Sequence, residues 1–182
     1  MACDLTLGRK EPCKDVVGGL KAVYFTDFGD YGTVTETADE ITDLTGTFTA
    51  FKYELKGNSS FEQAITSSRE NGTTFFDQTL TLTLKKLSKE DNKELKLLAY
   101  GRPHVAVEDY NGNVFVMGLQ HGAEVTGGTV STGAAMADLS GYTLTLNAQE
   151  VKPANFVNAP TAANPFVGMA SATVTVTEGT NS

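Results

Sequence analysis

The sequence predicts a mainly β protein, a β-sandwich or small barrel of seven to eight antiparallel strands with one flanking α-helix. Three observations indicate this class. Apolar and polar residues alternate in several short stretches, which is the period of a half-buried strand. Gly and Asn punctuate these stretches at turn spacing. A single segment has the helical period and helix-end signals, and it falls midway along the chain.

The strands are predicted one by one from composition and alternation. In residues 79–84, Leu80, Leu82 and Leu84 alternate with Thr79, Thr81 and Thr83, so the stretch 73–84 is the clearest strand. Aromatic and β-branched residues favour the others. These other predicted strands are 20–26, 47–55, 60–66, 104–110, 113–119, 141–146 and 172–177.

The helix is predicted at residues 89–100. Ser88 is a good N-cap, and acidic residues after it suit the positive end of the helix dipole. Leu95, Leu98 and Ala99 fall on one stripe. We expect Gly101 to take the left-handed conformation at the C-terminus, and Pro103 prevents the helix from continuing.

The centre of the predicted fold is a hairpin with Asn111-Gly112 at its turn. Asn-Gly between two apolar runs indicates a type I′ turn with a two-residue loop. The expected register places Asp109 opposite Val114, and Ala106 opposite Met117. One face then carries only valines, at 105, 107, 114 and 116, while the other carries Ala106, Phe115 and Met117 beside Glu108. Because one core covers one face, we expect Ala106, Phe115 and Met117 to lie at a subunit interface.

The chain of 182 residues is long enough for one domain, residues 1–182, and too short for two comfortable ones. Within it, residues 1–19 form an N-terminal arm, and residues 178–182 form a flexible tail. Residues 126–138, rich in Gly, Thr, Ser and Ala, are expected to form a loop. The N-terminus lacks a secretory signal, and no apolar run suits a membrane span.

Residues 27–46 are predicted to form a long acidic loop that contacts a neighbouring subunit. The segment has Gly29, Gly32 and repeated Thr, with neither Lys nor Arg between its acidic residues. A solvated surface loop is the alternative interpretation. The expected contact residues are Asp27, Asp30, Glu36, Asp39, Glu40 and Asp43.

The sequence contains few patterns that are typical of catalytic or ligand-binding sites. The net charge of −8 argues against a surface that grips nucleic acid. Cys3 and Cys13 are interpreted as free thiols rather than a zinc site, since a zinc site needs two further ligands. His121 near Glu124 is interpreted as an ordinary loop histidine rather than a catalytic base. We expect no enzyme activity, metal or cofactor.

A resemblance to a known family comes from the run VEDYNGNVFVMGLQHGAEVTGGTVSTGAAMADLSGYTLTLNAQEVKPANFV. This run resembles the C-terminal half of the tail tube proteins of long-tailed bacteriophages, in which an Asn-Gly hairpin, a Gly-rich loop and a Gly-Tyr-Thr-Leu-Thr-Leu strand follow one another. The resemblance covers roughly residues 75–157, including the preceding strand and helix; residues 1–45 have no counterpart. The tube proteins of contractile injection and secretion systems are related.

The resemblance implies a structural virion protein that closes into hexameric rings, which stack into a tube through which double-stranded DNA passes without specific binding. Its implied partners are copies of itself and other tail proteins, with no membrane, and its location is the virion tail after assembly in the host cytoplasm. The acidic surplus suits such a lumen, because like charge repels phosphates. Alternatives are a tail terminator, a baseplate ring or a head decoration protein, or a carbohydrate-binding β-sandwich module.

Overall fold

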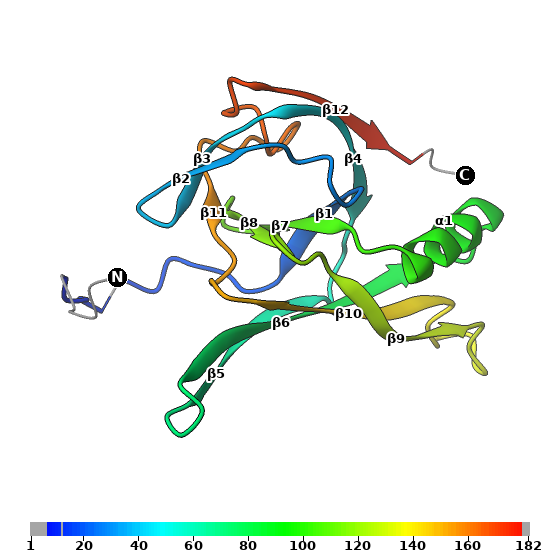
Figure 1. The fold of residues 1–182 in the computed structure, drawn as a ribbon. Coiled ribbons are helices and arrows are strands. Elements are labelled where there is room, and N and C mark those ends of the chain that lie inside the picture. The colour runs from blue at the N-terminus through cyan, green and yellow to red at the C-terminus, as the bar shows by residue number, and fades with distance from the viewer. Residues whose placement is uncertain (1–6, 12, 180–182) are drawn as a thin grey trace.

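The computed structural model describes residues 7–11 and 13–179, and this part contains twelve strands and one helix in two sheets (Figure 1). The mainly β fold with one flanking helix is confirmed, with more strands than predicted. The eight-stranded sheet has the order β12-β4-β1-β7-β8-β11-β3-β2, and the four-stranded sheet has the order β5-β6-β10-β9.

The bounds of the elements follow. The large sheet contains β1 (Leu20–Thr26), β2 (Val34–Thr37), β3 (Glu40–Leu44), β4 (Gly46–Glu54), β7 (His104–Asp109), β8 (Val114–Met117), β11 (Phe156–Val157) and β12 (Ala172–Glu178). The small sheet contains β5 (Ser60–Ser68), β6 (Thr73–Lys85), β9 (Glu124–Ser131) and β10 (Gly141–Glu150), and the helix is α1 (Lys89–Tyr100). Neighbouring strands are antiparallel except in the pairs β11–β3 and β12–β4, which are parallel.

The large sheet is buried on both faces because it curls. Its concave face encloses one core, which holds Tyr24, Ile41 and Phe48 and is completed by Phe166 from the loop after β11. Its other face packs on the small sheet and forms a second core, which includes Leu80, Leu82 and Leu146. The molecule is therefore a half-barrel with a filled interior, resting on a second sheet (Figure 1).

The central hairpin β7–β8 is present, but its predicted register is wrong by one residue. Val105 lies opposite Met117, and Ala106 lies opposite Val116. The loop therefore has three residues, and of the Asn-Gly pair only Gly112 takes a positive φ, of 84°. A one-residue shift moves every side chain of one strand to the opposite face. The predicted division into an all-valine face and a mixed face is accordingly wrong.

The curled sheet also removes the need for a partner at this hairpin. Ala106, Val114 and Val116 lie in the core inside the half-barrel, whereas Val105, Val107 and Met117 lie in the core between the sheets. Both faces of the hairpin are thus covered within one chain. The prediction rested on one core covering one face, and this chain has two cores.

Helix α1 begins and ends where predicted. The hydroxyl of Ser88 accepts a hydrogen bond from the amide of Asp91, which confirms the N-cap. Gly101 ends the helix with φ −94° and ψ 174°, so the left-handed C-terminus is wrong; its amide instead donates to Leu97 and Leu98. None of the helical residues is fully buried, so α1 lies on the domain rather than in it.

Two segments expected to be irregular contain strands. Most of residues 27–46 belongs to the hairpin β2–β3 at the edge of the large sheet, where Ile41 and Leu44 are fully buried. Residues 124–131 form β9, which pairs with β10 around a bulge. At the termini, the described residues 7–19 have neither helix nor strand, which agrees with an arm, while Glu178 belongs to β12 rather than to a tail. Cys3 lies outside the described residues.

Candidate functional site

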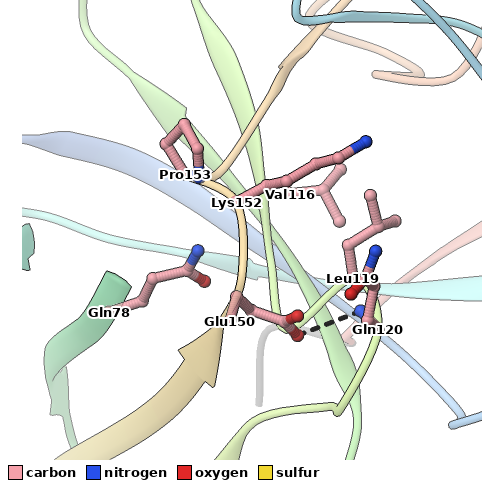
Figure 2. Close-up of a pocket in the computed structure, with 7 residues that line it drawn as sticks. All are labelled: Gln78, Val116, Leu119, Gln120, Glu150, Lys152 and Pro153. Atoms are coloured by element: carbon pink, nitrogen blue, oxygen red, sulfur yellow. Dashed lines mark hydrogen bonds between the residues drawn. The ribbon is translucent and has the colours of Figure 1, made fainter. Parts of the chain in front are cut away.

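Two hollows of the described structure differ greatly in size. The smaller has a volume of about 10 Å³, room for about one water molecule. Figure 2 shows its lining, which includes Gln78, Glu150 and Lys152. The larger is an open groove of about 710 Å³ beside α1. Among the described residues, the structure contains no cluster of three or more His, Cys, Asp or Glu side chains suited to a metal ion.

The carboxylate beside the small hollow stabilises a turn. Glu150 is buried, and its Oε1 accepts hydrogen bonds from the amides of Gln120 (2.9 Å) and His121 (2.8 Å). Its Oε2 lies 3.1 Å from Nδ1 of His121. The neighbour of His121 is therefore Glu150 from β10, and not Glu124 as its position in the sequence suggested. Each contact of this carboxylate orders the chain between β8 and β9.

His104 is buried at the start of β7 and joins three segments. Its Nδ1 lies 2.7 Å from the carbonyl oxygen of Gly118, and its Nε2 accepts from the amide of Gly29 at 3.3 Å. The ring stacks on Tyr31 with centroids 4.4 Å apart. Burial lowers the pKa of His104 and outweighs the opposite effect of the Gly118 carbonyl. A neutral imidazole that donates once and accepts once fits these contacts.

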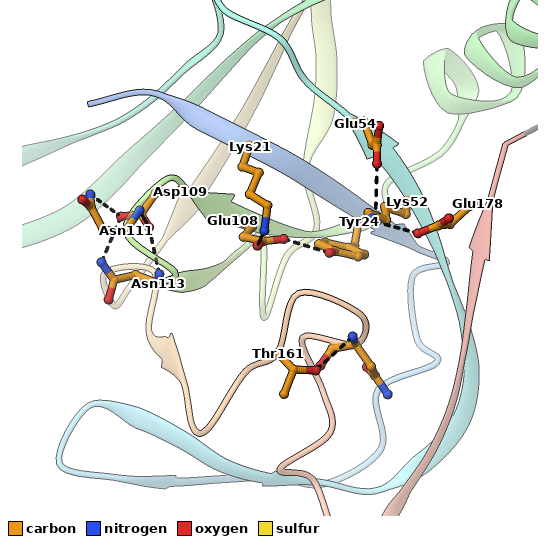
Figure 3. A network of polar contacts seen from close by, with 11 residues as sticks. Lys21, Tyr24, Lys52, Glu54, Glu108, Asp109, Asn111, Asn113, Thr161 and Glu178 are labelled. Carbon is orange, nitrogen blue, oxygen red and sulfur yellow. Dashed lines mark hydrogen bonds and ion pairs between the residues drawn. The ribbon is translucent and has the colours of Figure 1, made fainter. Parts of the chain in front are cut away.

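A second buried carboxylate lies on the central hairpin (Figure 3). Glu108 is almost fully buried, although it lies close to the turn. It accepts hydrogen bonds from Nζ of Lys21 (2.6 Å) and from the hydroxyl of Tyr24 (2.8 Å). The pKa of Tyr24 is raised, mainly by burial and next by its hydrogen bond to Glu108. The group is a satisfied structural network, since both oxygens have partners.

The hairpin residues that were predicted to lie at a subunit interface fall into two groups. Ala106 and Met117 are fully buried inside one chain, so the reason for placing them between subunits does not hold. Phe115 is half-buried, and its ring lies 4.6 Å from that of Phe156 and 6.1 Å from that of Phe61. Phe156 is 48% exposed, and Ile65, on the same face of β5 as Phe61, is 69% exposed. This cluster forms an apolar patch on the open side between the two sheets.

The acidic residues of the segment 27–46 are also divided. Glu36 pairs with Lys152, and Asp43 accepts hydrogen bonds from the backbone amide and the hydroxyl of Ser171, which lower its pKa. Asp39 lies at the exposed tip of the hairpin β2–β3. Asp27 and Asp30 precede β2, and Glu40 begins β3. The structure therefore places two of these six carboxylates before the hairpin and four along it, and does not gather them in one loop.

Both edges of the small sheet are open and long. The strand order leaves β5, of nine residues, and β9, of eight residues, with one neighbour each. Neither strand contains Lys, Arg or Pro. Natural sheets commonly protect an edge with such residues, because an unprotected edge pairs with another chain. These two edges are candidate contact sites.

The outer face of the small sheet is mainly polar, with Phe75 as its large apolar residue. Thr79, Thr81 and Thr83 alternate with the buried leucines of β6, and they lie opposite Asn147, Thr145 and Thr143 of β10. Strand alternation places the carboxylates Glu62, Asp77 and Glu124 on this face, with Lys85 as its one cation at the end of β6. Such a face has little attraction for phosphate groups.

Sequence reasoning missed most of these surfaces. Phe61 and Phe156 lie in segments with weak patterns, and Phe156 belongs to a two-residue strand. The open edge of β9 was interpreted as a loop because of Gly127 and Gly128. One available signal was the absence of Lys and Pro from residues 60–68, a polar stretch in which only Phe61, Ala64 and Ile65 are apolar.

Comparison with known proteins does not place the chain in a family. Among the described residues, the one helix is too short to cross a membrane. No family model matches the chain, and neither a curated protein nor a solved structure matches it.

Proposed function

We propose that this chain is a self-assembling structural subunit that forms rings, and that it is most specifically the subunit of a bacteriophage tail tube, whose stacked rings conduct DNA. The observation that carries the proposal is the pair of unprotected edges, β5 and β9, on opposite sides of one sheet. Contacts between two different surfaces of the same subunit close into a ring when the rotation allows. The sequence resemblance to tail tube proteins supports the same class.

The strand directions favour this joint. All neighbours in the order β5-β6-β10-β9 are antiparallel, so the four strands alternate in direction and the two edge strands run in opposite directions. When β9 of one copy meets β5 of the next in a head-to-tail ring, the new pair is antiparallel again. Each subunit thus continues the sheet without a break in its hydrogen-bond pattern. The Thr-rich outer face would then line one wall of the ring.

A lumen lined by this face suits the passage of DNA. Its hydroxyl groups are uncharged, its carboxylates repel phosphates, and its one lysine lies at the end of a strand. DNA affinity rises with the number of phosphates neutralised by Lys and Arg, and this face offers few. The apolar patch of Phe61, Ile65, Phe115 and Phe156 lies beside the β5 edge, so the same joint would cover it.

We assign the stacking of rings to the hairpin β2–β3, because its exposed acidic residues are suited to a contact with a neighbouring subunit. The whole segment cannot be removed to test this role, because shortening it between Thr26 and Thr47 would delete Ile41 and Leu44 from the core. The suitable change is Asp39→Lys at the exposed tip. We expect rings that form normally but do not extend into tubes.

Negative-stain microscopy of the purified protein across a concentration series tests the main proposal. Rings or tubes are expected from the unchanged protein. Two lysines on the edge, Ala64→Lys with Thr66→Lys in β5, should prevent rings and tubes from forming while the protein stays folded. The matched control is Thr173→Lys with Thr175→Lys in β12, the edge strand of the other sheet, which should still assemble. Monomers of the unchanged protein at every concentration, or equal assembly of both variants, would contradict the proposal.

A further inference from the structure

A large groove lies beside α1, and the proposed ring joint leaves it without an occupant. It lies between α1, β4, the end of β6 and β12. Its apolar floor includes Phe51 and Tyr53 of β4 and Leu84 of β6. Phe51 is 41% exposed, a large aromatic surface for a position in the middle of a strand. An exposed apolar surface with a polar rim is typical of a binding site.

The rim of the groove is acidic. Five carboxylates line it, against the three lysines at positions 52, 85 and 86. Nζ of Lys52 lies 2.6 Å from Glu178 and 3.7 Å from Glu54, so its charge is already compensated within the chain. The pKa of Tyr53 is raised to about 12, mainly by burial and to a smaller extent by the charges of Glu94 and Asp91. The groove therefore offers negative potential around an apolar floor. Its carboxylates are Glu54, Glu90, Asp91, Glu94 and Glu178.

The N-terminal arm has the opposite character. Each described residue from 7 to 19 is exposed, and these residues have neither helix nor strand. Residues 7–19 carry Arg9, Lys10 and Lys14 against Glu11 and Asp15, so this stretch has a net charge of +1 in a chain whose net charge is −8. Leu7, Val16 and Val17 expose most of their side chains, at 92%, 71% and 60%. An extended segment that presents apolar and basic side chains fits an apolar groove with an acidic rim.

The arm does not lie against the groove of its own chain. The amide and carbonyl of Val17 bond the side chain of Asn111 at 3.0 and 2.8 Å, which fixes the base of the arm at the tip of the central hairpin. From there the arm extends away from the domain, on the side opposite α1 (Figure 1). A positive segment on one side and a negative groove on the other are suited to a head-to-tail contact between copies.

We propose that the arm residues 7–11 and 13–17 of one copy occupy the groove beside α1 of a second copy. The apolar side chains of the arm cover Phe51, Tyr53 and Leu84, and its basic side chains face the acidic rim. This contact requires only that copies of the chain meet; it does not require a ring or a tube. Because charge pairs at a rim are screened by salt, the contact weakens as ionic strength rises.

Directed disulfide formation locates the contact. Cys13 in the arm is exposed and free. In full-length protein carrying Cys3→Ser, the change Glu94→Cys places a thiol on the rim of the groove. Mild oxidation with copper-phenanthroline should then give a ladder of covalent oligomers on a non-reducing gel. The matched control is Glu62→Cys, also an exposed glutamate but on β5, which should give little product. Equal ladders from both variants would overturn the proposal, as would a Glu94→Cys product that remains monomeric, because the arm would then fill its own groove.

Charge reversal provides an independent measurement. Arg9→Glu with Lys10→Glu should weaken self-association in sedimentation experiments by about tenfold or more, because like charges then meet at the rim. Adding Glu90→Lys and Glu94→Lys to the same chain should restore association. Lys96→Glu, on α1 but outside the groove lining, is the control and should have little effect. Failure of the reciprocal changes to restore association would contradict a direct contact between the arm and the groove.

Experiments can contradict either of the two proposals without contradicting the other. If the unchanged protein forms tubes but Cys13 does not link to Glu94→Cys, the arm contact is wrong and the tube subunit stands. If the link forms between copies while microscopy finds neither rings nor tubes, the arm contact stands and the proposed function is wrong.

Discussion

The turns of the hairpins β7–β8 and β2–β3 both differ from the turns that their sequences predict, and they differ in opposite ways. At β7–β8 the pair Asn111-Gly112 is the strongest signal for a two-residue type I′ turn, yet the loop has three residues and only Gly112 takes a positive φ. At β2–β3 the pair Ala38-Asp39 is a poor sequence for such a turn. Both of its residues nevertheless have positive φ, of 53° and 61°, in a two-residue loop between Thr37 and Glu40.

The side chain of Asp109 accounts for the first turn (Figure 3). Its Oδ1 accepts from the amides of Asn111 (2.9 Å) and Asn113 (2.8 Å), and its Oδ2 accepts from Nδ2 of Asn113 at 2.9 Å. These bonds stabilise a turn that begins at Asp109, with Gly112 as the left-handed residue that closes the three-residue loop. The local side chain, and not the Asn-Gly pair, sets the register of the central hairpin.

The second turn is imposed by the core. Ile41 and Leu44 are fully buried inside the half-barrel, and β3 also pairs with β11 on its other side. These contacts fix where β3 must lie, and the two residues of the turn accept an unfavourable conformation as a result. The comparison teaches that a nearby hydrogen-bond acceptor can overrule a strong turn sequence, and that burial of the following strand can impose a turn on a weak one.

The largest expected effect concerns the core that the central hairpin completes. Met117→Ala should lower the free energy of unfolding by about 2–5 kcal/mol, because it leaves a cavity at a fully buried position. Urea unfolding measures this loss. Phe115→Ala, on the same strand but half-buried in the apolar patch, is the control and should cost clearly less. Equal losses would mean that Phe115 belongs to the core and not to a contact surface.

Removal of the acceptor at the first turn should have the next largest effect. Asp109→Ala removes an acceptor that serves four donors of Asn111 and Asn113, and it should cost about 1–2 kcal/mol. Burial opposes the ionisation of Asp109, but the bonds from Asn113 and Asn111 outweigh it and lower its pKa. The stabilisation is therefore complete above the unfolded pKa of about 3.9 and is lost as the pH falls through the lower folded value.

Unfolding measured between neutral and acidic pH should show this loss in the unchanged protein and less of it in Asp109→Ala. Asp109→Asn retains an acceptor oxygen and should be intermediate in stability at neutral pH. A variant Asp109→Ala as stable as the unchanged protein would show that the Asn-Gly pair sets the register after all.

Replacement of the left-handed glycine tests the backbone alone. Gly112→Val should cost about 1–2 kcal/mol, because a β-branched residue resists a φ of 84° while a new Cβ would meet open space. Gly127→Val in β9 is a matched control, since Gly127 also faces open space but does not have a positive φ. An unchanged melting temperature for Gly112→Val would contradict the left-handed assignment.

The smallest effect is a gain of stability at the second turn. Ala38→Asn with Asp39→Gly gives this turn the pair that type I′ geometry prefers, and should stabilise the protein by about 0.5 kcal/mol. Thermal unfolding of the double variant measures the gain. A loss of stability would indicate that the side chain of Asp39 makes a contact that matters more than the backbone conformation.

The best sequence predictions were those in which period, caps and turn signals agreed. The strand Leu20–Thr26, the helix Lys89–Tyr100 and the alternation of Leu80 and Leu82 with threonines are present as predicted. Strands β2, β3, β9 and β11 were missed because they are short, polar or rich in glycine, and β3 and β11 pair with each other although they are far apart in the chain. Of the apolar patch at the proposed ring joint, only Phe115 was named in advance, and the register used to name it was wrong.

The sequence by itself determined the class of fold, the strongest strands and the one helix, because these depend on local period and on residues within a few positions of one another. Only the tertiary structure decided that the large sheet curls around its own core, that Met117 and Ala106 lie inside one chain, and that β5 and β9 are left as edges. The physical reason is the range of the interactions. Curvature, burial on two faces and open edges follow from pairings between residues far apart in the chain, such as β3 with β11 and β4 with β12.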